Sequence, residues 1–103
     1  MPFTPVTPAD IAPGTTRFVE VEGAAFLVAR DVDGCVHVLD GLCSHALFPL
    51  EGARIRRGSI ICPHHGARFD LATGAAKGPP AHCGIAHYAA RERDGMIEVD
   101  IAA

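Results

Sequence analysis

Apolar residues recur along the chain in segments of four to seven residues, separated by short polar stretches that contain glycine. Segments of this length, rich in Val, Ile and Phe, predict β-strands, and nothing in the pattern indicates a long amphipathic helix. The predicted strands are residues 17–22, 25–30, 35–40, 53–57, 59–62, 85–91 and 96–101. Many short strands predict an all-β fold, a sandwich or a barrel, in a single domain over residues 1–103.

Glycine and aspartate mark the expected turns, which lie at Gly23, 31–34, Gly58, 69–74 and 93–95. Asp94-Gly95 is the strongest of these signals, because Asp-Gly suits the two-residue loop of a β-hairpin. Four prolines in the first thirteen residues predict an extended arm, with an edge strand beginning at Phe3 as the alternative.

Composition and charge narrow the class of protein. Hydrophobic residues make up 49% of the 103 residues and charged residues 20%, as in soluble globular proteins, and no apolar run approaches the ~20 residues of a membrane span. No secretory signal is visible at the N-terminus, so we expect a cytoplasmic protein that does not bind a membrane. The net charge of −3 argues against a nucleic-acid partner. It suits docking onto basic patches of partner proteins, or it merely keeps the protein soluble.

Two cysteine-histidine motifs carry the chemistry. Cys43-Ser44-His45 is followed, after sixteen residues, by Cys62-Pro63-His64-His65. In a non-secreted chain such cysteines indicate metal or redox chemistry, because the cytosol keeps thiols reduced. Thiolates and imidazoles together indicate a mixed Cys/His iron-sulfur centre. A tetrahedral zinc site is the alternative, and the spacing alone does not decide between His64 and His65.

Further segments carry a resemblance to a known family. They are CSHA (43–46), PLEG (49–52), CPHHGARFDLATG (62–74), GPPA (78–81) and HYAARERDGMIEV (87–99). With these segments the chain resembles the Rieske-type ferredoxins of bacterial aromatic ring-hydroxylating dioxygenase systems over nearly its whole length. The resemblance implies one [2Fe-2S] cluster, with Cys43 and Cys62 on one iron and His45 and His65 on the other.

The resemblance also implies the fold around the cluster. We expect a sandwich of three antiparallel β-sheets, with cluster-binding loops at about 42–50 and 61–69 meeting at one tip. A loop around Pro79 and Pro80 would cover them. Because the family places its second histidine directly before a glycine, His65 and not His64 is the expected ligand.

The function implied is that of a monomeric electron carrier and not an enzyme. Such a ferredoxin takes one electron from a flavin-containing, NADH-dependent ferredoxin reductase and passes it to a terminal Rieske oxygenase. It would dock through the tip that carries His45 and His65. Two alternatives remain: a small Rieske-like subunit of an assimilatory nitrite reductase, and a redox-sensing binding module.

Departures from the family patterns bear on the reduction potential. Rieske proteins of cytochrome bc complexes have a disulfide between the two loops, where this chain has Phe48 and His64. They also have a serine and a tyrosine that donate hydrogen bonds to cluster sulfurs, where this chain has Ala67 and Phe69. Fewer donors stabilise the reduced cluster less, so we predict a potential near the low end of the Rieske range, about −150 to +300 mV. Leu47 and Phe48 predict an apolar cover or docking surface beside His45, with simple packing as the alternative.

The remaining cysteines and histidines have ordinary explanations. Cys35 and Cys83 are expected to be reduced and to act as small buried hydrophobic residues. His37, His82 and His87 lack ligand spacing and are expected to make ordinary hydrogen bonds.

Overall fold

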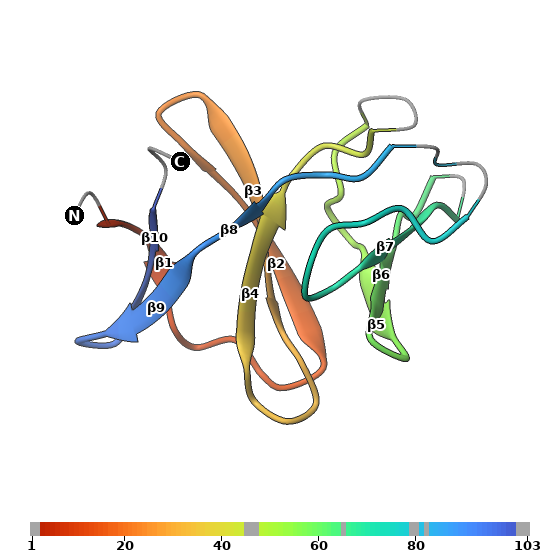
Figure 1. Ribbon diagram of the computed structural model, residues 1–103. Coiled ribbons are helices and arrows are strands. Elements are labelled where there is room, and N and C mark those ends of the chain that lie inside the picture. Colours follow the sequence, from red (N-terminus) through yellow and green to blue (C-terminus); the bar gives the residue numbers. More distant parts are fainter. Residues whose placement is uncertain (1–2, 45–47, 65, 79–80, 82, 101–103) are drawn as a thin grey trace.

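The computed structural model describes residues 3–44, 48–64, 66–78, 81 and 83–100, and every regular element in these ranges is a β-strand. The strands are β1 (Phe3–Pro8), β2 (Thr15–Val21), β3 (Ala24–Arg30), β4 (Val36–Asp40), β5 (Arg54–Arg56), β6 (Ser59–Ile61), β7 (Arg68–Asp70), β8 (His87–Tyr88), β9 (Ala90–Arg93) and β10 (Met96–Asp100). They form three antiparallel sheets, ordered β1-β10-β9, β2-β3-β4-β8 and β5-β6-β7 (Figure 1). The predicted all-β architecture of antiparallel sheets is confirmed. Within the described ranges, no helix has the length and hydropathy needed to cross a lipid bilayer.

The four-stranded sheet lies between the other two and is buried on both faces (Figure 1). Successive side chains of a strand point to opposite faces. Leu27 of β3 and Leu39 of β4 therefore pack in one apolar cluster, together with β6 and β7 residues, while Phe26 and Val38 pack in a second cluster with Ile97 of β10 and its neighbours. This double burial explains why residues 24–29 form a continuous apolar run.

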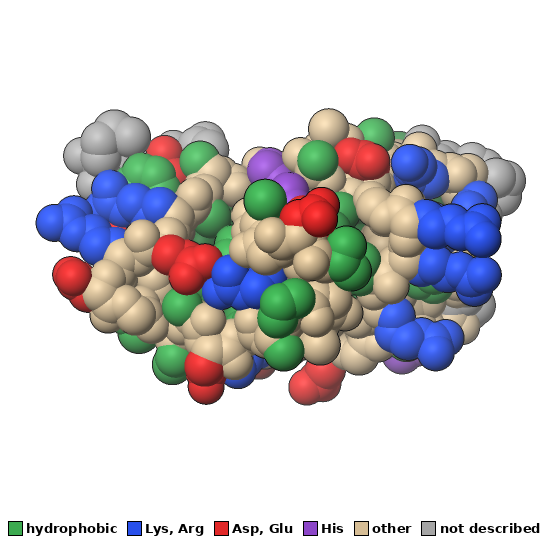
Figure 2. Space-filling view, turned by 90° about the horizontal axis from the view of Figure 1, so that it is seen from below, with side chains coloured by type: hydrophobic (Ala, Val, Ile, Leu, Met, Phe, Trp, Pro, Cys, Tyr) green, Lys and Arg blue, Asp and Glu red, His purple; other side chains and the backbone are tan. Residues whose placement is uncertain are grey.

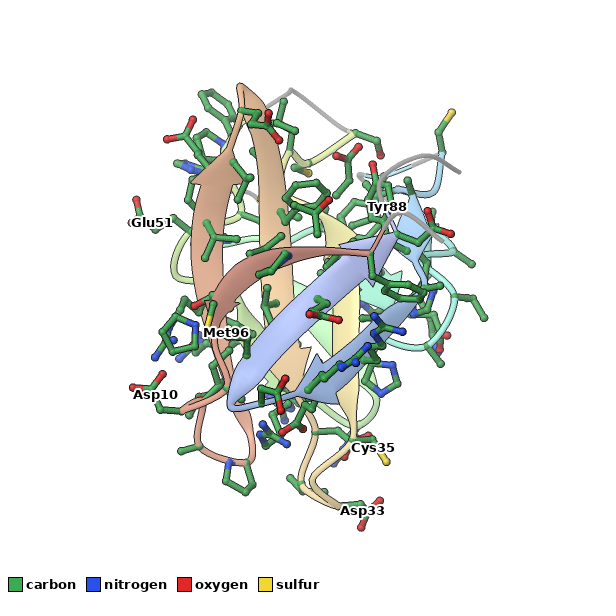
Figure 3. All side chains as sticks on the ribbon, turned by 90° about the vertical axis from the view of Figure 1, so that its left-hand side faces the viewer. Asp10, Asp33, Cys35, Glu51, Tyr88 and Met96 are labelled. Atoms are coloured by element: carbon green, nitrogen blue, oxygen red, sulfur yellow. The ribbon has the colours of Figure 1, made fainter. Side chains whose placement is uncertain are left out.

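The N-terminal arm is a strand. β1 pairs with β10 from Phe3 opposite Asp100 to Pro8 opposite Met96, with a register shift between Pro5 and Thr7. The prolines are tolerated because β1 is an edge strand of its sheet. The edge-strand alternative was therefore right and the unpaired arm wrong. Viewed from the side of the β1-β10-β9 sheet, β9 and β10 cross the strands of the central sheet (Figure 3).

Three hairpins turn through two-residue loops, as the glycine pattern predicts. The loops are Glu22-Gly23, Arg57-Gly58 and Asp94-Gly95, and both residues of each have positive φ, between 49° and 82°. Two positive φ values are the mark of the turn that matches the twist of the flanking strands, and the second position favours glycine.

Two sequence predictions need correction. Residues 85–91 do not form one strand, because Tyr88 pairs with Val38 in the central sheet while β9 pairs with β10. The expected turn at 69–74 is shorter, because its first two residues belong to β7, which pairs with β6. The turn proper follows Asp70, whose carboxylate accepts a hydrogen bond from the hydroxyl of Thr73 (2.9 Å).

Candidate metal centre

Cys43 and Cys62 lie in one apolar cluster between the central sheet and the β5-β6-β7 sheet. Their exposed fractions are 1% and 2%, and neither forms a disulfide. Cys43 follows β4, and Cys62 directly follows β6. Two strands from different sheets thus deliver the two thiols to the same buried region.

The two cysteine loops close in the same way. The backbone N–H of Cys43 donates to the carbonyl of Phe48, and that of Cys62 donates to the carbonyl of Ala67, both at 2.8 Å. In each loop the partner lies five residues after the cysteine. Gly66 also donates its N–H to the carbonyl of Cys62 at 3.0 Å. Each cysteine is therefore the anchored first residue of a short closed loop.

An aromatic pair joins the two loops. The rings of Phe48 and His64 are stacked, with their centroids 4.5 Å apart and an angle of 27° between the planes. Both residues are exposed, Phe48 to 41%. These are the positions at which the cytochrome bc proteins have their disulfide, so a non-covalent contact joins the loops here. The sequence marked both positions but did not predict the stack.

Residues 83–85 are tied to two other parts of the chain, the first cysteine loop and the turn after β7. The hydroxyl of Ser44 donates to the carbonyl of Cys83 at 2.5 Å, and the N–H of Ile85 donates to the carbonyl of Gly74 at 2.8 Å. Where the backbones of Gly74 and Ile85 meet, a Cβ on Gly74 would lie 2.1 Å from the carbonyl oxygen of Ile85, so only glycine fits. No sequence signal predicted the tie from Ser44.

The described donors fit an iron-sulfur cluster. Two thiols that are almost inaccessible, in closed loops within one apolar cluster, are suited to bind a soft metal centre as thiolates. The predicted ligands His45 and His65 lie outside the described residues, as do Leu47, Pro79, Pro80 and His82. His64, the competing candidate, is described and stacks on Phe48.

Comparison with known proteins identifies the family. The model of the Rieske [2Fe-2S] domain matches residues 3–89. The chain belongs to the Rieske [2Fe-2S] family. It therefore carries one Rieske-type [2Fe-2S] cluster, which sets the zinc alternative aside.

Several relatives of this Rieske protein are similar along almost their whole length. The ferredoxin component of the naphthalene 1,2-dioxygenase system of Pseudomonas putida is 30% identical over 94 residues, which are 91% of this chain and 89% of the relative. The solved structure of the Sphingomonas yanoikuyae B1 ferredoxin is 34% identical, with a TM-score of 0.86 over 95% of this chain and 97% of that chain. The ferredoxin of carbazole 1,9a-dioxygenase from Nocardioides aromaticivorans IC177 is 31% identical, with a TM-score of 0.84 over 94% and 95%.

Both cysteines outside the motif are exposed, so their predicted burial is wrong, while the prediction that they form no disulfide is confirmed. Cys35 projects from the β3–β4 turn beside Asp33 (Figure 3). The backbone of Cys35 is fixed in this turn, because its N–H donates to the carboxylate of Asp31 and its carbonyl accepts the N–H of Asp31. The carbonyl of Cys83 accepts the bond from Ser44.

His37 and His87 lie on neighbouring strands of the central sheet, β4 and β8. Their ring centroids are 6.0 Å apart, and Nε2 of His37 lies 3.1 Å from the carboxylate of Asp31. The backbone N–H of Cys35, followed by His37, holds the pKa of Asp31 below its ordinary value. Burial, followed by the charge of His37, lowers the pKa of His87. The contact with Asp31 agrees with the hydrogen bond predicted for His37, while His87 contacts the ring of His37.

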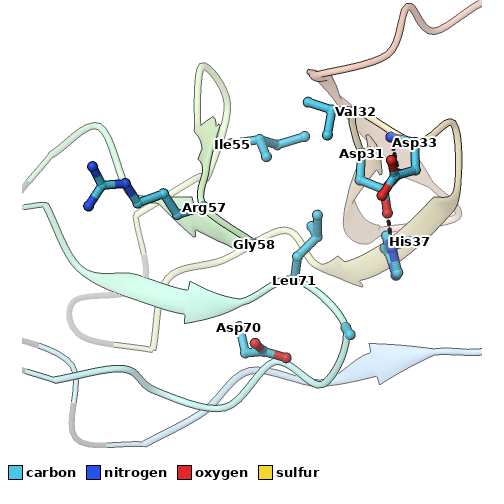
Figure 4. A pocket seen from close by; sticks show the side chains of 10 residues that line it. Asp31, Val32, Asp33, His37, Ile55, Arg57, Gly58, Asp70 and Leu71 are labelled. Carbon is cyan, nitrogen blue, oxygen red and sulfur yellow. Dashed lines mark hydrogen bonds and ion pairs between the residues drawn. The ribbon is translucent and has the colours of Figure 1, made fainter.

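A surface hollow of about 420 Å³ lies between the β3–β4 turn and the β5-β6-β7 sheet (Figure 4). Val32, Ile55 and Leu71 form its apolar part, and the Asp31–His37 pair lies at one side. Neither Cys43 nor Cys62 lines it. The hollow is therefore separate from the metal loops.

Proposed function

We propose that this chain is the ferredoxin of an aromatic ring-hydroxylating dioxygenase system. It takes one electron from a flavin-containing, NADH-dependent reductase and passes it to the Rieske centre of a terminal oxygenase. The observation that carries the proposal is its end-to-end similarity to ferredoxin components of such systems. One of its structural relatives, 28% identical with a TM-score of 0.82, is the ferredoxin in a complex of reduced oxygenase and oxidized ferredoxin in carbazole 1,9a-dioxygenase. The chain is an electron-transfer component and not itself the enzyme.

We further propose the ligand set predicted from the resemblance. Cys43 and Cys62 bind one iron as thiolates, and His45 and His65 bind the other through their imidazoles, in loops at about 42–50 and 61–69 of a single domain. The buried thiols in closed loops support the first pair. The ring of His64 is stacked on Phe48, and this contact supports His65 as the histidine of the second pair.

When bound, the cluster supplies a one-electron couple whose potential depends on hydrogen bonds to its sulfurs. Ala67 and Phe69 are both fully buried beside the cysteines, in the same apolar cluster, and neither has a hydroxyl to donate. We therefore propose a potential near the low end of the Rieske range, about −150 to +300 mV. A redox titration that gave a midpoint well above 0 mV would contradict this.

The partners follow from the same proposal. The tip that carries the two loops docks transiently on the reductase and then on the oxygenase, and a monomer suits this exchange. A protein in the cytoplasm has access to both partners and to NADH.

Reconstitution tests the function. Purified protein, an NADH-dependent reductase and a candidate oxygenase are combined, and dihydroxylated product is measured with and without this chain. Product should depend on the chain, and equal product in its absence would refute the carrier function. Stable copurification with a large sirohaem subunit would instead favour a nitrite reductase.

Matched variants test the ligands. Cys43→Ser should abolish the visible absorbance, the electron paramagnetic resonance signal of the reduced protein and the product. Cys35→Ser changes an exposed cysteine in the β3–β4 turn and should leave all three unchanged. His65→Ala should lose the cluster while His64→Ala keeps it, and the reverse result would exchange the two assignments.

A further inference from the structure

Charge is distributed unevenly between the sheets. Residues 41–85, which include the β5-β6-β7 sheet and the cysteine loops, hold five of the nine Lys and Arg residues but two of the twelve Asp and Glu residues. Their formal charge is therefore +3. The remaining residues, with four basic and ten acidic side chains, carry −6. The net charge of −3 is therefore the sum of a basic segment, residues 41–85, and an acidic remainder.

Three of the five basic residues of this segment share one face of the β5-β6-β7 sheet, and the other two, Arg57 and Lys77, line a hollow with Arg56 and Arg68. Strand register places Arg54 opposite Ile61 and Ile61 opposite Arg68, and Lys77 donates its backbone N–H to the carbonyl of Arg68 at 2.9 Å. Arg56 lies two residues after Arg54 on the same face. We call Arg54, Arg56, Arg57, Arg68 and Lys77 the basic face; all five are exposed.

The opposite side of the same sheet is apolar, which explains why the charges point outward. Ile60 and Phe69 are fully buried in the cluster that holds the cysteines, and Ile55 and Ala76 pack against it. Figure 2 shows Lys and Arg side chains gathered at one end of the molecule, over the β5-β6-β7 sheet. A hollow of about 370 Å³ lies among them, lined by Arg56, Arg57, Ser59, Ile61, Arg68 and Lys77.

Ion pairing distinguishes this face from the rest of the surface. Outside residues 41–85, all four arginines pair with carboxylates: Arg17–Asp10 at 2.7 Å, Arg30–Glu92 at 2.8 Å, Arg91–Glu98 at 2.6 Å and Arg93–Asp94 at 3.9 Å. On the basic face, Lys77 lies 3.5 Å from Asp70, but the four arginines form no ion pair with any described residue. Their charge is therefore available to a partner.

The basic face adjoins the cysteine loop. Arg54, Ile61 and Arg68 form one row across the three strands, and Ile61 directly precedes Cys62. Arg68 directly follows Ala67, whose carbonyl accepts the N–H of Cys62 and closes that loop. A protein held on this row would lie beside the loop of Cys62. Opposite charge on a docking surface raises the rate of encounter and fixes orientation.

We propose that the basic face docks an acidic surface of a redox partner protein and orients it toward the cluster loops. This inference rests on the proposed carrier function and names the chemistry of its docking site. A nucleic acid fits less well, because the face has no aromatic side chain on which a base could stack and the rest of the chain carries −6. The same −6 opposes an anionic membrane.

The test uses two one-electron acceptors of higher potential, an acidic b-type cytochrome and a basic c-type cytochrome. Reduced, cluster-containing protein passes one electron to ferric haem, and stopped-flow absorbance follows the haem as salt is raised. The net charge of −3 alone predicts repulsion from the acidic acceptor and a rate that rises with salt. The basic face predicts that this rate falls with salt.

Two double variants with equal charge change separate the basic face from net charge. Arg54→Gln/Arg56→Gln removes two charges that have no hydrogen-bond or ion-pair partner among the described residues, so the fold is not disturbed. It should slow transfer to the acidic acceptor roughly three- to tenfold at low salt and abolish the fall with salt. Arg91→Gln/Arg93→Gln removes two charges from β9, in another sheet, and should keep the wild-type rate and salt dependence.

The outcomes are distinguishable. A rate that rises with salt, or equal loss in both double variants, would overturn the inference while leaving the carrier function intact. Wild-type binding to duplex DNA or to phosphatidylserine vesicles that only Arg54→Gln/Arg56→Gln abolishes would overturn the assignment to a protein partner. A normal cluster spectrum without electron transfer to either cytochrome would refute the carrier function itself.

Discussion

A methyl group on Gly74 should loosen the contact between the turn after β7 and residues 84–85. In Gly74→Ala the new Cβ would lie 2.1 Å from the carbonyl oxygen of Ile85 and 3.1 Å from its carbon. Both contacts are with backbone, so no side chain can move aside. The two segments must separate by more than 1 Å to reach an ordinary contact of 3.4 Å, and the hydrogen bond from Ile85 to Gly74 is stretched or broken.

The expected loss of stability has three contributions. Gly74 has a φ of +81°, and a residue with a Cβ costs about 1–2 kcal/mol there. Loss of the hydrogen bond costs about 0.5–1.5 kcal/mol, and overpacking costs about 1–3 kcal/mol. The free energy of unfolding should fall by about 3 to 6 kcal/mol.

Gly52→Ala is the matched control. Its φ of +85° is nearly the same, but nothing lies within 4 Å of the added Cβ, so only the backbone strain of about 1–2 kcal/mol applies. Urea unfolding followed by circular dichroism should give a midpoint for Gly74→Ala about 1–2 M below that of Gly52→Ala. If Gly74→Ala does not fold, Gly84→Ala replaces it, because its Cβ meets the carbonyl oxygen of Gly74 at 2.7 Å without a positive φ. Equal midpoints for Gly74→Ala and Gly52→Ala, or a wild-type midpoint for Gly84→Ala, would refute the reasoning.

Three further predictions concern the loops, the pH dependence and the exposed thiols. Phe48→Ala removes a stacked pair that contributes about 0.5–1.5 kcal/mol, so bleaching of the visible absorbance by a chelator should be about three- to tenfold faster; His64→Ala should give the same increase, and the double variant no more. Because burial, followed by the charge of His37, lowers the pKa of His87 below 6.5, its stabilising contribution is complete above pH 6.5 and is lost as the pH falls toward the lowered pKa. The melting temperature should therefore drop less between pH 7.5 and 5.5 in His87→Gln than in wild type, and parallel curves would exclude this role. A thiol reagent should modify two cysteines in the intact protein, Cys35 and Cys83, and four after unfolding; more than two before unfolding would contradict the burial of the motif thiols.

Local sequence was sufficient for the turns and for the chemistry. Two-residue loops such as Asp94-Gly95 are encoded by residues that contact only their neighbours, and their φ values agree with the prediction. The motif cysteines are recognisable because ligand type and spacing are themselves sequence properties. The Rieske family match then agreed with the resemblance seen in the same residues.

Prediction failed where the partner of a segment is distant in the chain. The arm at Phe3 is a strand because it pairs with residues up to Asp100, and residues 85–91 divide because two different sheets compete for their backbone. The wrong burial predicted for Cys35 has a local cause instead. The carboxylate of Asp31, four residues earlier, accepts the N–H of Cys35 and fixes its backbone in the β3–β4 turn.

The sequence by itself determined that this is an all-β Rieske protein with two cysteine-histidine motifs, since those properties depend on residue types and on near neighbours. Only the tertiary structure decided which surfaces those residues share. It brought Phe48 and His64 together across two loops, and it placed Arg54, Arg68 and Lys77 in one row beside Cys62. The reason is physical: strand register and sheet packing join positions far apart in the chain, and the net charge of −3 averages over the faces that they create.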